Sequence, residues 1–166
     1  MFQSDYPLHF RDKDDTVNMA QNTYKIKYHS KYFCEQLTEL GIIPRKSLLL
    51  KFPEWLPKKL IPYLIKGTID GDGWVQKDVV GFMSTYDFCL GVQTFLSSIG
   101  ITSKIMNMKR NYNENTKVLY LCGRNNIIPL TEIMFSHGNL YIERKYQKYI
   151  EYGFLNNSII NNSQSV

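Results

Sequence analysis

Apolar residues follow two different periodicities along this chain, and the change from one to the other occurs three times. In each case a short run with apolar residues at alternate positions leads, through a small residue, into a stretch with apolar residues three or four positions apart. The first period is typical of strands and the second of helices. The pattern therefore predicts three strand–helix segments, at residues 23–42, 79–101 and 118–135.

The ends of the predicted helices carry ordinary capping residues. Ser30 precedes the helix of the first segment, and Ser84 or Thr85 precedes that of the second. A side-chain oxygen at this position can accept a hydrogen bond from a free backbone N–H of the first helical turn. Gly41 and Gly100 end these two helices, as glycine commonly does. The helix boundaries are thus predicted independently of the apolar pattern.

Further signals extend the order of elements. Strands are predicted at 74–77 and 105–110, and polar turns at 76–78 and 111–115 separate them from their neighbours. An opening helix begins at Pro62, and a last helix covers about 142–152. The order helix, hairpin, helix, hairpin, helix predicts an α+β fold, an antiparallel sheet with helices on one face.

Composition and charge narrow the class of protein. The chain has 166 residues, of which 43% are hydrophobic, and this suits one globular domain or a domain with an arm. It lacks 18 consecutive apolar residues and a signal-peptide pattern, so we expect an intracellular protein of cytoplasm, organelle or phage-infected cell, not secreted and not in a membrane. Its three cysteines form no CxxC pair, which favours reduced core thiols. The net charge of +5 permits a nucleic-acid partner.

Basic and amide side chains gather on the predicted strands and turns. A ribbon of this kind can enter a DNA major groove, where arginine, lysine and the amides recognise base edges. The alternative is a solvated sheet edge. The candidates for DNA contact, together with an aromatic residue and an arginine of the last helix, are Trp74, Gln76, Lys77, Lys104, Asn107, Lys109, Arg110, Lys117 and Arg144.

The stretch "YLIKGTIDGDGWV" (63–75) places a glycine inside an apolar helix and two acids at its end. Gly67 and Gly71 lie one turn apart on one face, which allows a second helix to approach closely. Asp70 and Asp72 stand where the helix dipole disfavours carboxylates. Two such helices side by side would bring their acids together, and hard oxygen ligands at that density suit Mg²⁺. The simpler alternative is an Asp-Gly turn that ends the helix and starts a hairpin.

The nine residues "IKGTIDGDG" (65–73) resemble the signature of the LAGLIDADG homing endonucleases. The matching positions are Gly67, Ile69, Asp70, Gly71, Asp72 and Gly73. Lys66 and Thr68 depart from the usual small and apolar choices. The resemblance extends over about residues 24–150 and implies an αββαββα unit with a saddle-shaped sheet.

The resemblance implies roles for individual residues. Asp72 matches the acid that ligates the catalytic metal, Mg²⁺ or Mn²⁺, and Gly71 the position whose carbonyl assists it. Asp70, with Gly67 and Gly71, would support helix pairing. Lys145 is the best match to the basic catalytic residue near the scissile phosphate, with Arg144 as its competitor. Phosphate binding or a solvated helix face remain alternatives for both.

The resemblance also implies an organisation. We expect a partial repeat with a proline-rich connector at 1–60, the LAGLIDADG repeat at 61–153 and a flexible tail at 154–166. The expected activity is that of an intron-encoded homing endonuclease, which hydrolyses phosphodiesters of double-stranded DNA. Because the sequence holds one motif, we expect the protein to act as a homodimer. The alternatives are a catalytically silent nucleic-acid-binding protein, such as an intron maturase that binds RNA or a DNA-binding regulator, and an interaction protein whose helix glycines serve dimerisation only.

Overall fold

A computed structural model describes residues 7–11, 23–27, 29–42, 49–107, 114–136 and 140–155. The chain divides into two compact units, Met1–Leu40 and Gly41–Val166, and each is described by itself. The division falls earlier than the expected boundary at residue 60, which stays a prediction about repeats. The expected flexible tail lies almost entirely outside the described residues.

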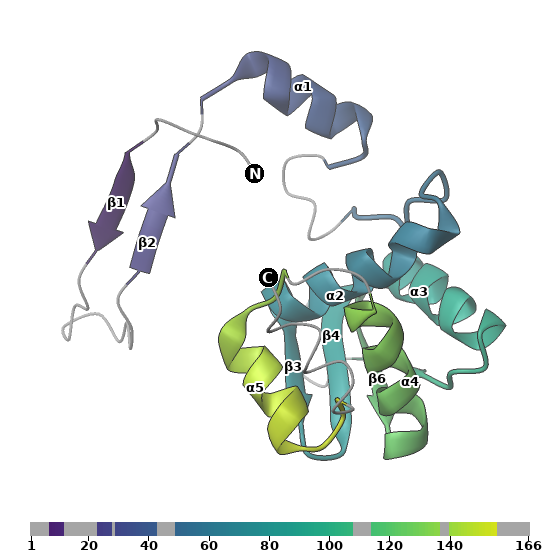
Figure 1. The fold of residues 1–166 in the computed structure, drawn as a ribbon. Coiled ribbons are helices and arrows are strands. Elements are labelled where there is room, and N and C mark those ends of the chain that lie inside the picture. Colours follow the sequence, from purple (N-terminus) through teal and green to yellow (C-terminus); the bar gives the residue numbers. More distant parts are fainter. Residues whose placement is uncertain are drawn as a thin grey trace. The chain divides into compact units, whose positions relative to one another are not determined.

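The first unit is a hairpin followed by a helix (Figure 1). Strands β1 (Leu8–Arg11) and β2 (Thr23–Ile26) pair antiparallel, with Leu8 opposite Ile26. Helix α1 (Lys31–Glu39) begins at Ser30, whose hydroxyl accepts a hydrogen bond from the Phe33 backbone N–H at 3.1 Å. The cap agrees with the sequence prediction. Strand β1 was not predicted, because its four residues are too few to show a clear alternation.

The second unit contains the predicted order of elements (Figure 1). A 3₁₀ turn, η3 (Lys58–Leu60), leads into α2 (Ile61–Asp72), hairpin β3 (Gly73–Gln76) and β4 (Val79–Thr85), and α3 (Tyr86–Ser98). A second hairpin, β5 (Lys104–Asn107) and β6 (Thr116–Cys122), is followed by α4 (Arg124–Phe135) and α5 (Glu143–Glu151). The α+β prediction is thereby confirmed.

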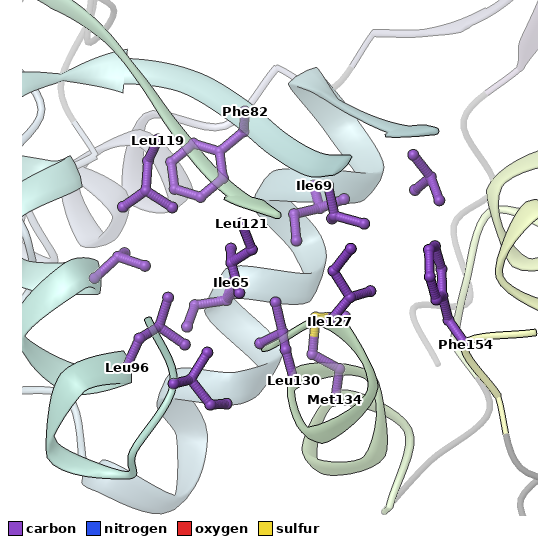
Figure 2. Packing of buried hydrophobic residues seen from close by; sticks show 14 of the residues in the cluster. Ile65, Ile69, Phe82, Leu96, Leu119, Leu121, Ile127, Leu130, Met134 and Phe154 are labelled. Atoms are coloured by element: carbon purple, nitrogen blue, oxygen red, sulfur yellow. The ribbon is translucent and has the colours of Figure 1, made fainter. Parts of the chain in front are cut away.

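The four strands of this unit form one antiparallel sheet in the order β3-β4-β6-β5. Alternate residues are buried on one face, among them Val80, Phe82, Leu119 and Leu121. Helices α2 and α4 pack there, and Figure 2 shows their isoleucines, leucines and methionine against the strand residues. Because strand residues alternate between faces, the intervening positions lie on the opposite face of the sheet.

Helix α2, called the motif helix from here on, buries one stripe of isoleucines. Ile61, Ile65 and Ile69 lie four residues apart and are almost inaccessible to solvent. Pro62 occupies the first turn, where its missing N–H costs nothing. The helix continues through Asp72, so both acids belong to its last turn.

The connector before the motif helix packs on α3. A Cβ at Gly91 would lie 2.2 Å from Cγ of Phe52, so the absence of a side chain at Gly91 makes room for that ring.

Thr85, rather than Ser84, caps α3: its hydroxyl accepts a hydrogen bond from the Phe88 N–H at 3.3 Å. Among the helices in the described part of the chain, none is long and apolar enough to cross a bilayer.

Candidate functional site

The C-terminal end of the motif helix is held by a lysine from a different helix. Lys145 of α5 is only 3% exposed, and its Nζ donates to the main-chain oxygens of Asp70 and Gly73, both at 2.7 Å, and of Ile69. The last carbonyls of a helix have few partners within it, and Lys145 bonds that of Asp70, adds a second bond to that of Ile69, which also accepts the Gly73 N–H, and reaches the oxygen of Gly73 at the start of β3. The lysine also places a positive charge at the negative end of the helix dipole.

The environment of Lys145 has opposing electrostatic effects. Burial lowers the pKa of its ammonium most strongly, and the neighbouring charge of Arg144 lowers it further. The carboxylates of Asp70 and Asp72 act in the opposite direction and favour the charged form. Both acids are therefore close enough to Lys145 to interact with its charge, and the cation offsets the carboxylates that the sequence places at an unfavourable helix end.

A second buried lysine fixes the side chain of Asp70. Lys66, one turn earlier on the motif helix, is 6% exposed, and its Nζ lies 3.3 Å from Oδ2 of Asp70. The same ammonium donates to the main-chain oxygen of Leu140 and lies 5.0 Å from the ring centroid of Phe135. These contacts join the motif helix to the segment that leads into α5, and they engage the carboxylate of Asp70 within the fold.

The carboxylate of Asp72 has a different setting. Asp72 is the last residue of the motif helix and is exposed. The next residue, Gly73, begins β3 without a spacer, and a Cβ there would lie 2.6 Å from the oxygen of Gly81 and 2.7 Å from Cα of Ile69. A side chain at Gly73 would overlap backbone atoms, so this glycine is required for the close turn. That turn leaves Asp72 at the surface.

One face of the motif helix is left open by the described residues of its own unit. Gly67 and Gly71 are exposed, and a Cβ at either position would meet no atom within 4 Å. Tyr63, one turn before Gly67, is also exposed. The contacts of the described chain therefore do not account for these two glycines, in contrast to Gly73.

The oxygen atoms near Asp72 suit a hard cation but do not complete a site. Within the described ranges, no three histidine, cysteine, aspartate or glutamate residues gather closely enough to hold a metal ion. Lys145 takes the carbonyls of Ile69, Asp70 and Gly73, and that of Gly71 is not among them. One carboxylate and one carbonyl are ligands that Mg²⁺ accepts, with the remaining positions left for other oxygens.

The strand register divides the predicted DNA contacts between two faces of the sheet. Trp74, Gln76 and Lys104 lie on the face opposite the helices, called the open face from here on. Asn107 and Lys117 pair with each other and share the parity of the buried residues Leu119 and Leu121. Of the other candidates, Lys77 lies in the β3–β4 turn, Arg144 is exposed on α5, and Lys109 and Arg110 lie outside the described residues.

Sequence reasoning missed two residues of this site. Lys66 was noted only as a departure from the motif, although its spacing of four from Asp70 is a signal for a helical ion pair. Tyr149 of α5 is 1% exposed, and its hydroxyl has no hydrogen-bond partner in the described chain. Burial, and secondly the charge of Asp70, raises the pKa of Tyr149. No local pattern marks a buried tyrosine on an otherwise polar helix as a neighbour of the motif.

The chain matches one family model and is similar to one protein of known sequence. The family model described as "LAGLIDADG-like domain" matches residues 61–134, from the motif helix through most of α4. The chain is also similar to a protein of Methanocaldococcus jannaschii described as "Probable translation initiation factor IF-2". The identity is 34% over 116 residues, which cover 64% of this chain and 10% of the relative. The chain thus spans about a tenth of the length of that protein.

Proposed function

We propose that this chain is a LAGLIDADG protein, which the match of the family model to residues 61–134 supports, and that it is a site-specific double-strand DNA endonuclease that works as a homodimer paired through the motif helix. The observation that carries the proposal is the exposed Asp72 at the end of a helix whose glycine face is open. A second motif helix on Gly67 and Gly71 would place its own Asp72 close to the first.

A divalent cation completes this proposal. Asp72 and the carbonyl of Gly71 from both chains would hold Mg²⁺ or Mn²⁺, together with water and phosphate oxygens. Such a cation, when bound, activates water and stabilises the leaving oxygen of a phosphodiester. The contribution of the protein is to present the two carboxylates at a fixed separation on two helix ends, which removes the cost of ordering them.

Lys145 acts on this site through the backbone. Sequence reasoning gave it a role at the scissile phosphate, but its ammonium is buried and bonded to three carbonyls. We assign it as a positioning residue that fixes the last turn of the motif helix, and therefore Asp72 and the carbonyl of Gly71. Arg144, the exposed neighbour, is the better candidate for contact with a phosphate.

DNA would lie against the open face of the sheet. Trp74, Gln76 and Lys104 are on this face, and Lys77 stands in the adjoining β3–β4 turn. Such a surface offers an amide and a lysine for base edges. Asn107 and Lys117 lie at strand positions that alternate to the other side of the sheet, so we do not expect them to contact bases directly.

One observation favours a second candidate, a nucleic-acid-binding protein that does not cleave, such as an intron maturase. The best match to the family's basic catalytic residue is Lys145, and its ammonium is engaged by three main-chain oxygens. A binder needs the scaffold but not the exposed Asp72. The two candidates therefore differ in what happens when Asp72 is neutralised.

Cleavage of a plasmid library that carries randomised inserts tests the proposal. Wild type with Mg²⁺ is expected to linearise a subset of plasmids whose inserts share a roughly palindromic sequence. Excess chelator and Asp72→Asn should both abolish the product. If the protein retains DNA tightly but cuts no insert, the nuclease assignment fails and the binding protein stands. If Asp72→Asn cuts as well as wild type, the site assignment fails.

A further inference from the structure

The open face of the sheet is largely apolar. Besides the pair Thr85–Thr116, where β4 runs into α3, the strand register arranges its outward positions in three rows, and of these the middle row crosses all four strands. Lys104 carries the only charge in the rows, and none of them contains a carboxylate. The rows are Gln76–Val79–Cys122, Trp74–Gly81–Tyr120–Lys104 and Met83–Val118–Met106.

Gly81 makes the middle row a continuous aromatic surface. A Cβ at Gly81 would lie 2.9 Å from Cζ2 of Trp74 and 2.9 Å from Cβ of Tyr120. The indole of Trp74 therefore lies over the glycine, toward Tyr120 on the next strand. Because an indole and a phenol occupy the centre of the face, an approaching polar backbone would find few hydrogen-bonding partners there.

The third row exposes methionine to water. Met83 is 36% exposed and Met106 is 44% exposed, with the partly exposed Val118 between them. Contiguous apolar surface of this kind usually marks a binding site. The charge of the face favours an anionic partner, because it carries Lys104 and no acid, and the whole chain has a net charge of +5.

These two properties together point to base edges rather than phosphates. In the major groove the one apolar group on a base pair is the C5-methyl of thymine, and aliphatic side chains recognise it by contact. Gln76, in the first row, has the amide that pairs with adenine. We propose that the open face recognises A·T-rich duplex DNA, with the row Met83–Val118–Met106 on thymine methyl groups.

This inference rests on the proposed function, since it takes duplex DNA as the partner, and it specifies which bases are read. It differs from the expectation for the basic part of the predicted ribbon, whose arginine and lysine side chains would favour G·C pairs. A protein partner is the competing occupant of an apolar sheet face, and the experiment below separates the two.

Thymine and uracil differ only by the C5-methyl group, so a comparison of binding to duplexes that contain one or the other tests the proposal. Wild-type protein is used to select duplexes from a random library, and a selected duplex is then synthesised again with uracil in place of thymine. Each lost methyl contact should weaken binding about fourfold, so two or more contacts predict a loss of at least about tenfold. We also expect runs of A·T pairs among the selected sequences.

Matched variants assign the effect to the row. Met83→Ala with Met106→Ala should bind the thymine and uracil duplexes within about twofold of each other, because few methyl contacts remain. Leu90→Ala is the control, since Leu90 is similarly exposed (42%) but lies on α3, away from the open face. It should discriminate between the duplexes as wild type does.

A chemical probe on the same face keeps the test independent of these variants. Cys122 is exposed in the first row, and Cys34 is exposed on α1. Bound duplex should slow alkylation of Cys122 severalfold and leave that of Cys34 unchanged. If uracil and thymine duplexes bind and are cleaved equally, the thymine inference is wrong while the nuclease stands. If no duplex is retained, the proposed function fails. If duplex is retained without protecting Cys122, the face serves another partner.

Discussion

The main-chain oxygen of Asp70 accepts a hydrogen bond of 2.7 Å from the buried Nζ of Lys145. This bond explains how the fold accommodates two acids at the end of the motif helix. A cation from α5 stands where the helix dipole is negative, and it satisfies two further carbonyls of Ile69 and Gly73. The last turn is therefore built within one chain before any second helix or ion arrives.

Replacement of Lys145 by methionine tests its role as a cap. The variant removes the charged donor of three hydrogen bonds to main-chain oxygens, and we expect the free energy of unfolding to fall by about 2–3 kcal/mol in urea titrations. Arg144→Met, at the exposed neighbouring position, should leave stability within about 0.5 kcal/mol of wild type. Unchanged stability of Lys145→Met would show that the lysine serves substrate rather than the fold.

The two acids of the motif should separate into different phenotypes. Asp72 is exposed, so Asp72→Asn should keep the melting temperature of wild type. Cleavage by this variant should fall by about 10²-fold or more, because a metal ligand is lost. Asp70→Asn removes the charge that faces the buried Lys66 and should lower the melting temperature measurably. Thermal melting and plasmid cleavage of both variants provide the comparison. Equal loss of stability in the two would contradict the division of roles.

The three glycines of the motif offer a matched series. Gly67→Ala and Gly71→Ala place a methyl group in open space, and each should stabilise the single chain by up to about 1 kcal/mol through helix propensity. Both should nevertheless weaken dimerisation and cleavage, because the methyl groups separate the paired helices. Gly73→Ala should instead destabilise the chain by about 1–3 kcal/mol, since its Cβ overlaps backbone. Urea titration with gel filtration distinguishes these outcomes.

The three thiols should differ in how readily they ionise and react with an alkylating reagent. Burial raises the pKa of Cys89 from 9.0 to about 11, whereas Cys34 and Cys122 are exposed. At pH 8 an alkylating reagent should label two thiols in the native protein and three in urea. Because the unfolded chain ionises Cys89 first, this residue's contribution to stability should be lost as pH rises from 9 to 11. Rapid labelling of Cys89 in the native protein would contradict the burial of this α3 residue.

Much of the fold could be predicted because it depends on local periodicity. The alternation in β4 and β6, the cap at Thr85 and the stop at Gly100 are all visible in the sequence, and the structure has them. The sequence places both acids of the motif at the end of a helix, where they oppose the dipole. The helix reaches Asp72, and Lys145, 73 residues later in the chain, supplies the compensating charge. A contact of that range leaves no local pattern.

The site was predictable in part for the same reason. The spacing of Gly67 and Gly71 places them on one helix face, and the resemblance of the motif to the family signature implies the role of Asp72. The division of the basic ribbon between two faces depends on strand register, and a shift of one residue exchanges the faces. Only the pairing of Lys104 with Tyr120 and of Asn107 with Lys117 resolves which side chains share the open face.

The central claim is that two motif helices, one from each of two chains, pair on DNA to form the cleavage site. The mass of the complex with a selected target duplex, measured by sedimentation in Ca²⁺ to slow cleavage, tests it most directly. We predict two chains of 19.5 kDa on each duplex for wild type, and one chain for Gly67→Leu with Gly71→Leu. A single wild-type chain on each duplex that still cuts both strands when Mg²⁺ is added would contradict the account.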